Sequence, residues 1–449
     1  MFRRFLIGIL ALLDLGVVAP AEAEAALLPD ITVAADGSGD FKSVHAAVQS
    51  IPRDNRERRI IFVKDGLYAE KVRVDASNVT IRGQSRKGTR IEFFQAQGGG
   101  GGGENRGGAI VNLSNNAHDC VIENLTIKNT QGVLGVHAFA VMGRADRTVI
   151  IDCDVLSHGN DTIALWRGRA EDAAALAAGA PPADPTILKD SGRYYHARLN
   201  VTGSVDFICP RGWCYMADST ITELNPGSTA SVWHDGSNDP DKKFVMRNCR
   251  FDGVEGWWLA RHHHDAHFYF IDCSFSKVMR DTAPYRVVYP LNGGKATEAD
   301  NRRNADLDRT NVYGERAYYD NSHRDGGDYV WHRNNLSSAP GSPKPDQITA
   351  KWTFAGTWDP EDTAGPKIVN ITSNDGKIQV KFAERVTVKG KPDVKLTGGA
   401  TAPYDGGSGS DTLVFTGDGN AASIDLNGGV IIASIASATT RSADLTLPR

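Results

Sequence analysis

Two aspartates occupy matching places in neighbouring repeats of this sequence. Asp161 follows a short segment ending at Val155 by six residues, and Asp206 follows a similar segment ending at Val201 by five. Nearly equal offsets in consecutive repeats put both carboxylates on one face, because stacked parallel strands lie about 4.7–4.9 Å apart. Repulsion at that distance raises one pKa, which suits an acid beside an ionised nucleophile.

Arg261 is the residue expected to accompany this pair. It lies between the segments around Cys249 and Cys273, in what we expect to be a turn. Its guanidinium could keep one carboxylate ionised and oriented. Acidic residues on such turns are often simply exposed to solvent, so the spacing alone does not decide between catalytic aspartates and ordinary surface residues.

A loose internal repeat provides the frame for these residues. The aligned seven-residue segments, each expected to be one short strand, are 121–127, 149–155, 195–201, 215–221, 245–251 and 269–275. They start at intervals of 28, 46, 20, 30 and 24 residues. Such spacing predicts an all-β fold, a right-handed parallel β-helix. Its fifth column contains Cys153, Cys249 and Cys273, which we expect to be buried thiols.

The other cysteines leave one question open. Cys209 and Cys214 flank Pro210 and Gly212, an arrangement that favours a tight turn. The sequence does not decide between a disulfide across that turn and two free thiols. The chain has no Cys-x-x-Cys pair, so a structural zinc site is not expected.

Charge and the first residues restrict the partners and the location. Lys and Arg number 50 against 54 Asp and Glu, which provides no general positive field for nucleic acid or an anionic membrane. Arg3 and Arg4 precede an apolar run and small residues, which predicts a cleaved signal peptide over residues 1–25. An uncleaved anchor is the alternative. We expect a secreted or periplasmic protein with no membrane contact after cleavage.

The ends of the solenoid and two interruptions have their own patterns. Residues 31–33 predict a strand and 41–51 an amphipathic helix that covers the open end of the coils. The glycines of 98–103 predict a flexible loop, and 169–188 a short helix at the rim of a groove.

The composition changes near residue 366. Residues 366–449 contain no Cys, His or Trp, and their apolar and polar residues alternate between Gly, Asp and Asn turns. This pattern predicts a small β-sandwich. It resembles the immunoglobulin-like modules appended to bacterial secreted proteins, so we expect an accessory domain.

Five segments resemble those of pectin methylesterases, also called pectinesterases, in the order found in that family. They are Val33 to Phe41, Ile61 to Val72, Gly159-Asn-Asp-Thr162, Gly203-Ser-Val-Asp-Phe-Ile208 and Leu259-Ala-Arg261. The Gly-x-Val-Asp-Phe-Ile segment is the most specific. The resemblance extends from residue 31 to about 360 and implies a β-helix catalytic domain over residues 26–362.

The resemblance also implies roles for the three charged residues. Asp206 would attack the ester carbonyl, Asp161 would protonate the departing methanol and then activate water, and Arg261 would keep Asp206 ionised. The implied reaction is hydrolysis of methyl esters of galacturonate in pectin or a related acidic polysaccharide. No cofactor or metal is expected, and the protein is expected to be a monomer.

The chain departs from the family at the groups that stabilise the oxyanion. His137 and Asn160 occupy the positions of two glutamines. Asn160 retains an amide donor on a shorter side chain, and His137 can donate through a ring nitrogen. We therefore expect a modified oxyanion hole.

The expected substrate contacts also differ. His262-His263-His264 follows Arg261 where the family has Pro-Trp. We expect the sugar to be contacted by Trp233, Trp257, Trp258, His263 and Phe207. Ordinary packing is the alternative for Trp257 and Trp258. Adjacent histidines on an extended segment point alternately, so we expect surface or groove-lining histidines and no metal site.

Other functions remain open on the sequence. The protein could act on a different sugar ester, or it could be a non-catalytic polysaccharide-binding β-helix. Thioester hydrolysis and a polysaccharide lyase on the same scaffold are further alternatives, although no carboxylate cluster indicates the calcium site of a lyase.

Overall fold

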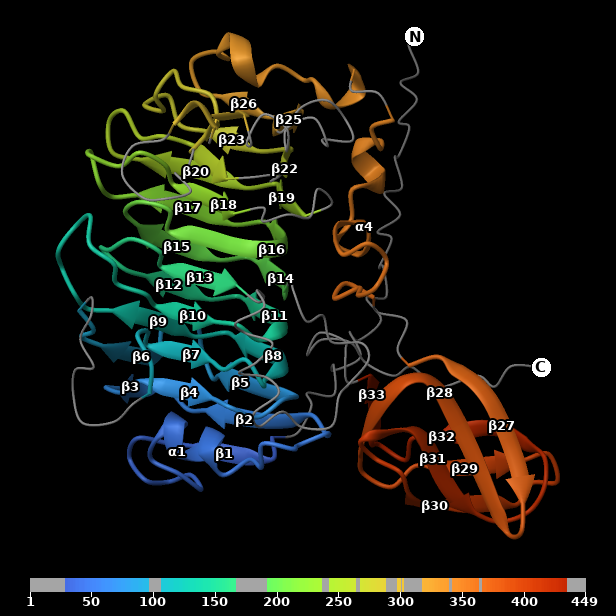
Figure 1. Cartoon of the computed structure of the whole chain (residues 1–449). Helices are drawn as coiled ribbons and strands as arrows, with labels where there is room; N and C mark the ends of the chain where they lie inside the picture. The colour runs from blue at the N-terminus through green and yellow to red at the C-terminus, as the bar shows by residue number, and fades with distance from the viewer. Residues whose placement is uncertain are drawn as a thin grey trace, which may run out of the picture.

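Short parallel strands wind into a β-helix of three sheets, followed by a separate antiparallel β unit (Figure 1). The computed structural model describes residues 29–96, 106–166, 192–235, 242–263, 267–287, 297–299, 301–302, 317–338, 341–362 and 366–433. The predicted signal peptide, the loop at 98–103 and the predicted helix at 169–188 lie outside these residues. No helix among the described residues is long and apolar enough to span a membrane.

Most coils contribute one strand to each sheet. Sheet A contains β1 (Ile31–Val33), β2 (Arg59–Val63), β5 (Val79–Gly83), β8 (His118–Glu123), β11 (Asp146–Ile151), β14 (Gly192–Ala197), β16 (Ile208–Ala217), β19 (Lys243–Arg247), β22 (His267–Ile271) and β25 (Ala317–Asp320). Sheet B contains β3 (Gly66–Tyr68), β6 (Thr89–Phe93), β9 (Thr126–Asn129), β12 (Asp154–Leu156), β15 (Asn200–Gly203), β17 (Thr220–Glu223), β20 (Arg250–Gly253), β23 (Ser274–Phe275) and β26 (His323–Arg324). Sheet C contains β4 (Val72–Val74), β7 (Val111–Leu113), β10 (Val141–Gly143), β13 (Ile163–Trp166), β18 (Val232–Asp235), β21 (Ala260–His263) and β24 (Tyr285–Arg286). The long β16 crosses from sheet C into sheet A and joins the two.

The predicted repeat alignment is confirmed in its register. The first residues of the six aligned segments pair with one another on successive coils: Val121, Val149, Tyr195, Tyr215, Val245 and Tyr269. The prediction of one strand per segment is wrong, because each segment forms a sheet A strand and a sheet B strand. A residue in the left-handed region bends the chain between them, with φ of 55° at Asn124 and Asp152. Asn and Asp tolerate this conformation better than most side chains, so they recur at the corner.

The interior column that follows each corner is buried as expected. Cys153, Cys249 and Cys273 are at most 2% exposed, and all six cysteines are free. The disulfide considered for Cys209 and Cys214 is therefore absent. Both residues lie in the single strand β16 instead of on a turn. Five residues of extended chain separate them by roughly 16 Å, far beyond the span of a disulfide.

The first coil is covered by the predicted amphipathic helix. Helix α1 (Val44–Gln49) begins after Ser43, whose hydroxyl accepts a hydrogen bond from the Ala46 N–H. Val44, Ala47 and Val48 are buried against the first coil. The prediction that this helix covers the open end is confirmed.

A strap formed by residues 336–338 and 341–358 returns along the outside of sheet A. It includes η2 (Leu336–Ser338), η3 (Pro345–Gln347) and α4 (Ala350–Thr353), and η1 (Val330–His332) precedes it. Ile348, Phe354 and Trp358 of the strap bury the outer apolar residues of the sheet. Arg193 Nη1 donates to Thr357 Oγ1 at 3.1 Å. The strap thus leads from the last coils back toward the first (Figure 1).

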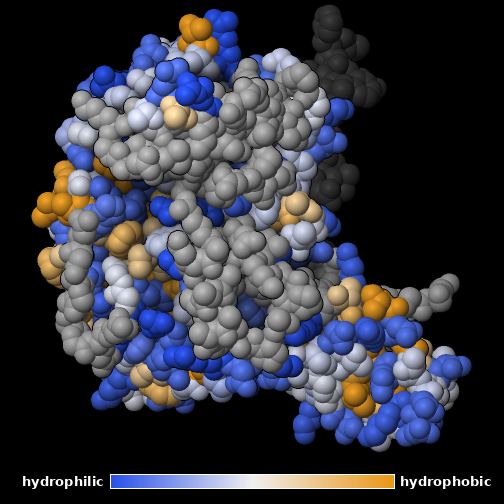
Figure 2. All heavy atoms as spheres, viewed as in Figure 1, coloured by the Kyte–Doolittle hydropathy of each residue, from blue (hydrophilic) through white to orange (hydrophobic). Residues whose placement is uncertain are grey.

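Seven antiparallel strands form the C-terminal unit. They are β27 (Ile368–Asn374), β28 (Lys377–Lys389), β29 (Asp393–Leu396), β30 (Thr401–Gly406), β31 (Ser410–Thr416), β32 (Ala421–Asp425) and β33 (Val430–Ala433). The unit has its own apolar core, which includes Val380, Leu413 and Phe415. It contacts the first coils, where the Arg58 N–H donates to Thr387 Oγ1 at 2.8 Å. Its visible surface is mostly hydrophilic (Figure 2).

Candidate active site

The two predicted aspartates occupy equivalent positions on adjacent coils. Asp161 and Asp206 each precede a sheet C strand by two residues, and those strands begin with the paired residues Ile163 and Ile208. The Asp161 N–H donates to Val205 O at 3.1 Å, which joins the two turns. Both aspartates have positive φ, 56° and 53°. Equivalent turns one coil apart direct both carboxylates to the same side of the helix.

Glycines allow the two turns to pack closely. A Cβ at Gly203 would lie 2.2 Å from Phe207 Cβ and 2.5 Å from Thr162 Oγ1. A Cβ at Gly159 would lie 2.4 Å from both Ala138 Cβ and Val136 O. Any larger residue would push these turns apart, so the two glycines fix the separation of the aspartates.

Arg261 forms a two-pronged ion pair with Asp206. It lies in β21, so the expected turn at this residue is wrong. Its Nε donates to Oδ1 and Oδ2 of Asp206 at 2.9 and 3.2 Å, and its Nη2 also donates to Oδ2. The guanidinium lies 5.1 Å from the ring centroid of Trp233, which pairs with Arg261 on the intervening strand β18. Arg261 therefore extends across this ring to reach a carboxylate two coils away.

The surroundings of Asp206 set its charge. Burial raises the pKa of Asp206 to about 6, the Arg261 pair opposes this rise, and the neighbouring Asp161 adds to it. Only 8% of Asp206 is exposed. An ionised but poorly solvated carboxylate at neutral pH suits a nucleophile.

His137 faces the other aspartate from the preceding coil. Its Nε2 lies 3.1 Å from Asp161 Oδ2. This hydrogen bond, together with the charges of Asp161 and Asp206, raises the pKa of His137 above its usual value. The raised pKa favours the protonated, positively charged form of His137.

Asn160 joins the same turns through its side-chain amide. Its Nδ2 donates to Gly135 O at 3.1 Å, and its Oδ1 accepts from the Val205 N–H at 3.2 Å. One of its two amide hydrogens is therefore already used on the preceding coil, and its oxygen is used on the following coil.

Comparison with known proteins identifies the relatives of this chain. Residues 30–170 match the pectinesterase family. The chain is 28% identical over 229 residues to a pectinesterase/pectinesterase inhibitor of Solanum lycopersicum, covering 49% of this chain and 34% of that protein. It is 26% identical to a pectinesterase of Petunia integrifolia, covering 49% of this chain and 53% of that one. Part of this chain is thus similar to pectinesterases, at low identity.

Solved structures agree on the β-helix. A pectin methylesterase from Erwinia chrysanthemi has a TM-score of 0.53 and 17% identity, covering 75% of this chain and 99% of its own. A pectin methylesterase solved with a hexasaccharide has a TM-score of 0.54 and 16% identity, covering 75% and 100%. Pectinesterases are carboxylic ester hydrolases. The chain spans a third to a half of the length of the curated relatives named above.

The predicted substrate contacts separate into two groups. Trp258 is half-buried and receives the Arg280 guanidinium 4.6 Å from its ring centroid, whereas Trp233 lies beneath Arg261 and is only 4% exposed, so it supports Arg261 and offers little surface to a sugar. Phe207 and Trp257 cannot contact a sugar, because they are 0% and 1% exposed in the core. The prediction is wrong for these two.

The turn geometry explains where those two rings lie. The bend at the aspartate before Phe207 turns its ring inward, against Gly203. Trp257 packs on Phe251, and its Nε1 donates to Ser276 Oγ at 2.9 Å. Both rings therefore support the turns from within.

The histidine run is only partly at the surface. His262 is 5% exposed beside Phe268 and lines a pocket with Trp331. The neighbouring His267 is 1% exposed, so the expectation of surface or groove-lining histidines is wrong for His267. His263 ends β21, and its side chain lies outside the described part, as does residue 264. Among the described residues, no group of three His, Cys, Asp or Glu could hold a metal ion.

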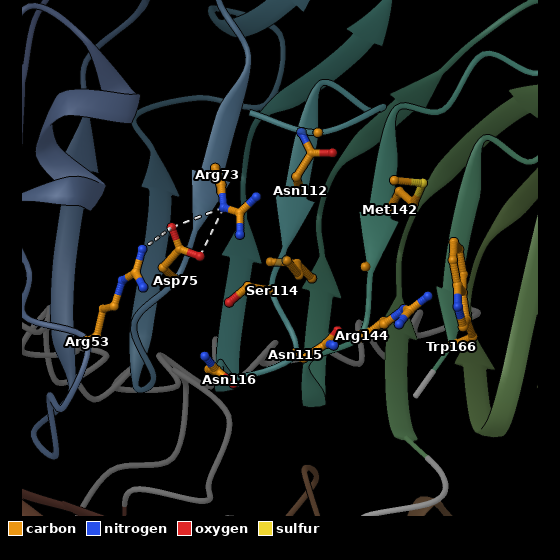
Figure 3. A pocket seen from close by; sticks show the side chains of 13 residues that line it. Arg53, Arg73, Asp75, Asn112, Ser114, Asn115, Asn116, Met142, Arg144 and Trp166 are labelled. Atoms are coloured by element: carbon orange, nitrogen blue, oxygen red, sulfur yellow. Dashed lines mark hydrogen bonds and ion pairs between the residues drawn. The ribbon is translucent and has the colours of Figure 1, made fainter. Parts of the chain in front are cut away.

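Sequence reasoning missed a second set of polar residues on the same sheet. Arg73, Arg144 and Trp166 line a groove on the outer face of sheet C (Figure 3). Aligning the sheet C strands would have revealed them, but strands of three or four residues carry too weak a pattern.

Proposed function

We propose that this chain is a carbohydrate esterase that hydrolyses methyl esters of galacturonate in pectin or a related acidic polysaccharide. The observation that carries the proposal is the ion pair of Arg261 with a buried Asp206, one coil from Asp161. The pectinesterase relatives support the substrate class.

In the proposed reaction, Asp206 attacks the ester carbonyl carbon and forms an acyl-enzyme anhydride. The departing methoxide takes a proton from the hydrogen-bonded pair of Asp161 and His137, whose Oδ2 and Nε2 atoms lie 3.1 Å apart. Asp161 then removes a proton from water, which attacks the anhydride and restores the Asp206 carboxylate. Arg261 keeps Asp206 ionised and oriented before each attack.

Stabilisation of the oxyanion is assigned to His137 and Asn160. A cationic His137 adds positive charge where negative charge develops. Asn160 has one amide hydrogen beyond the one bonded to Gly135 O. The half-buried Trp258 is the aromatic surface proposed for the sugar ring, whereas the buried Trp233 supports Arg261 from beneath.

Methanol release from methylated pectin tests the proposal. Asp206→Asn keeps the side-chain volume and removes the nucleophile, so we expect a loss of at least about a thousandfold in kcat. Asp218→Asn is the matched control, since Asp218 also occupies a left-handed turn position but lies on another corner. Equal rates for Asp206→Asn and the unaltered chain would refute the assignment.

One observation favours a second candidate function. Because the Asn160 amide is bonded to Gly135 O and the Val205 N–H, a donor at the predicted oxyanion position is partly occupied. A non-catalytic polysaccharide-binding protein would show this feature too. Binding of methylated pectin without methanol release would identify it.

We also propose the organisation of the whole protein. Residues 1–25 would be a signal peptide for secretion or export to the periplasm, and residues 26–362 the catalytic domain. Residues 366–449 would be an immunoglobulin-like accessory sandwich, supported by the seven antiparallel strands with their own core. The protein would act as a monomer. Mass spectrometry of the exported protein and size-exclusion chromatography test these statements.

A further inference from the structure

A groove of about 390 Å³ opens on the outer face of sheet C, among strands β4, β7, β10 and β13 (Figure 3). Three arginines line it: Arg53, Arg73 and Arg144. Among its described lining residues, Asp75 is the one carboxylate. The groove therefore has a net charge of +2, from three cations and one anion, in a chain whose formal net charge is -4.

The single carboxylate contacts two of these three cations. Arg73 Nε donates to Asp75 Oδ1 at 3.0 Å, and Arg53 Nη2 lies 3.9 Å from Oδ2 of the same group. Figure 3 shows both arginines directed at Asp75 from opposite sides. A guanidinium has five N–H donors, so each retains donors for an anionic ligand.

An aromatic ring forms the other end of the groove. The guanidinium groups of Arg144 and Arg211 lie 5.5 and 5.4 Å from the ring centroid of Trp166. Trp166 is half-buried, which leaves part of the ring on the groove side. A ring offers a flat apolar surface to the C–H face of a sugar, while a guanidinium matches a carboxylate with two parallel hydrogen bonds.

A polar atom in the groove has no partner within the described residues. The hydroxyl oxygen of Ser114 is buried and makes no hydrogen bond there. A buried hydroxyl without a partner costs free energy. This hydroxyl oxygen therefore lies within the wall of the groove and not on its open surface.

The groove and the candidate active site share one face of one sheet. The register of sheet C forms an outward column from the groove to the site: Arg73, Asn112, Met142, Ala164, Cys209, Trp233 and Arg261. Each step is about 4.8 Å, so Arg73 and Arg261 are roughly 29 Å apart. Only a polymer can contact both at once.

We propose that this groove is a distal binding site for the free carboxylates of uronate units in a polysaccharide chain. The guanidinium groups of Arg73 and Arg144 bind the carboxylates, and Trp166 stacks on a sugar ring. The choice of uronate rests on the proposed function. The groove holds sugars that carry no ester, while an esterified unit of the same chain lies at Asp206.

Binding of unesterified polygalacturonate by isothermal titration calorimetry tests the proposal, because it requires no hydrolysis. With the full chain we expect Arg73→Gln/Arg144→Gln to weaken binding at least about tenfold. The matched control is Arg198→Gln, which removes a half-exposed arginine paired with Asp152 on another corner. We expect no change there. Raising the salt from 20 to 500 mM should weaken binding by the unaltered chain.

The outcomes separate the groove from the proposed esterase. The groove assignment is overturned if Arg73→Gln/Arg144→Gln binds polygalacturonate as tightly as the unaltered chain, or if Arg198→Gln weakens binding. It is also overturned if neutral dextran binds equally well. If the chain binds polygalacturonate through these arginines but releases no methanol, the proposed function fails and the groove stands. Arg144→Lys keeps the charge and should retain part of the affinity. If thermal denaturation shows that the double variant is not folded, Arg144→Gln alone decides, and unchanged binding refutes the proposal.

Discussion

Replacing Arg261 by glutamine should move the pH dependence of the reaction. Arg261→Gln keeps a side chain of polar character at this position but removes the charge that opposes protonation of Asp206. In the unaltered chain the pKa of Asp206 is about 6, so activity should fall below that pH as the nucleophile becomes protonated. Without Arg261, burial and Asp161 act unopposed, and the acid limb must shift to higher pH.

The size of the shift follows from the contact. An opposite charge in direct contact lowers a carboxyl pKa by about 1–3 units, so the pKa of Asp206 should rise to roughly 7–9 in the variant. At pH 7 the ionised fraction would fall from roughly nine tenths to between about one half and one hundredth. The loss in kcat/KM at pH 7 should therefore be about twofold to a hundredfold, and much of it should return near pH 9.

Methanol release measured from pH 4 to 9, after subtraction of spontaneous ester hydrolysis, gives the profile of kcat/KM. Arg250→Gln is the control, because Arg250 pairs with Asp325 on sheet B, away from the site. Its profile should match that of the unaltered chain. The reasoning is refuted if Arg261→Gln lowers the rate with the acid limb still near pH 6, or if that limb lies near pH 4 in the unaltered chain.

Three further results are expected. Trp257→Ala should lower the free energy of unfolding by about 3–5 kcal/mol in urea denaturation, because it removes a fully buried ring. Trp258→Ala should instead raise KM with little change in stability. A raised KM for Trp257→Ala together with a loss of stability for Trp258→Ala would contradict both assignments. His137→Ala should lower kcat by about a hundredfold with partial recovery in His137→Gln, which restores a neutral donor; equal kcat values for both variants would remove His137 from the oxyanion site. Thiol titration should detect none of the 6 cysteines in the folded protein and all of them in guanidinium, and a deficit of two thiols would restore the disulfide between Cys209 and Cys214.

The sequence predicted the stacking of coils better than the direction of side chains near turns. The aligned segments that begin at Val121 and Val149 pair in the predicted register, because apolar residues must recur wherever each coil meets the core. The corners were missed. A single left-handed residue, such as Asn124, reverses the alternation of side chains and divides the segment into two strands.

The same effect explains the errors at the candidate site. Phe207 follows Asp206 and was expected beside it, but the positive φ of the aspartate turns the next ring into the core. Cys209 and Cys214 looked like the ends of a turn because Pro210 separates them, although a proline is tolerated in a strand when its nitrogen is not needed as a donor. Residue type alone predicts neither the inward ring of Phe207 nor the strand that contains Cys209 and Cys214. The direction of the Phe207 ring and the position of the two cysteines in one strand both depend on where the chain bends.

The strap and the C-terminal unit affect how this molecule unfolds. In a simple solenoid each coil contacts only its neighbours, so the stack can fray from either end. Here the hydrogen bond from the Arg58 N–H to Thr387 Oγ1 joins residues 329 positions apart, and the Tyr195 hydroxyl donates to Glu361 on the way back. The terminal coil cannot peel away without also breaking contacts made by the end of the chain. Contacts from residues late in the chain thus hold the first and middle coils together. We expect the β-helix to unfold in one cooperative step and to reach its final form only after these late residues have been synthesised.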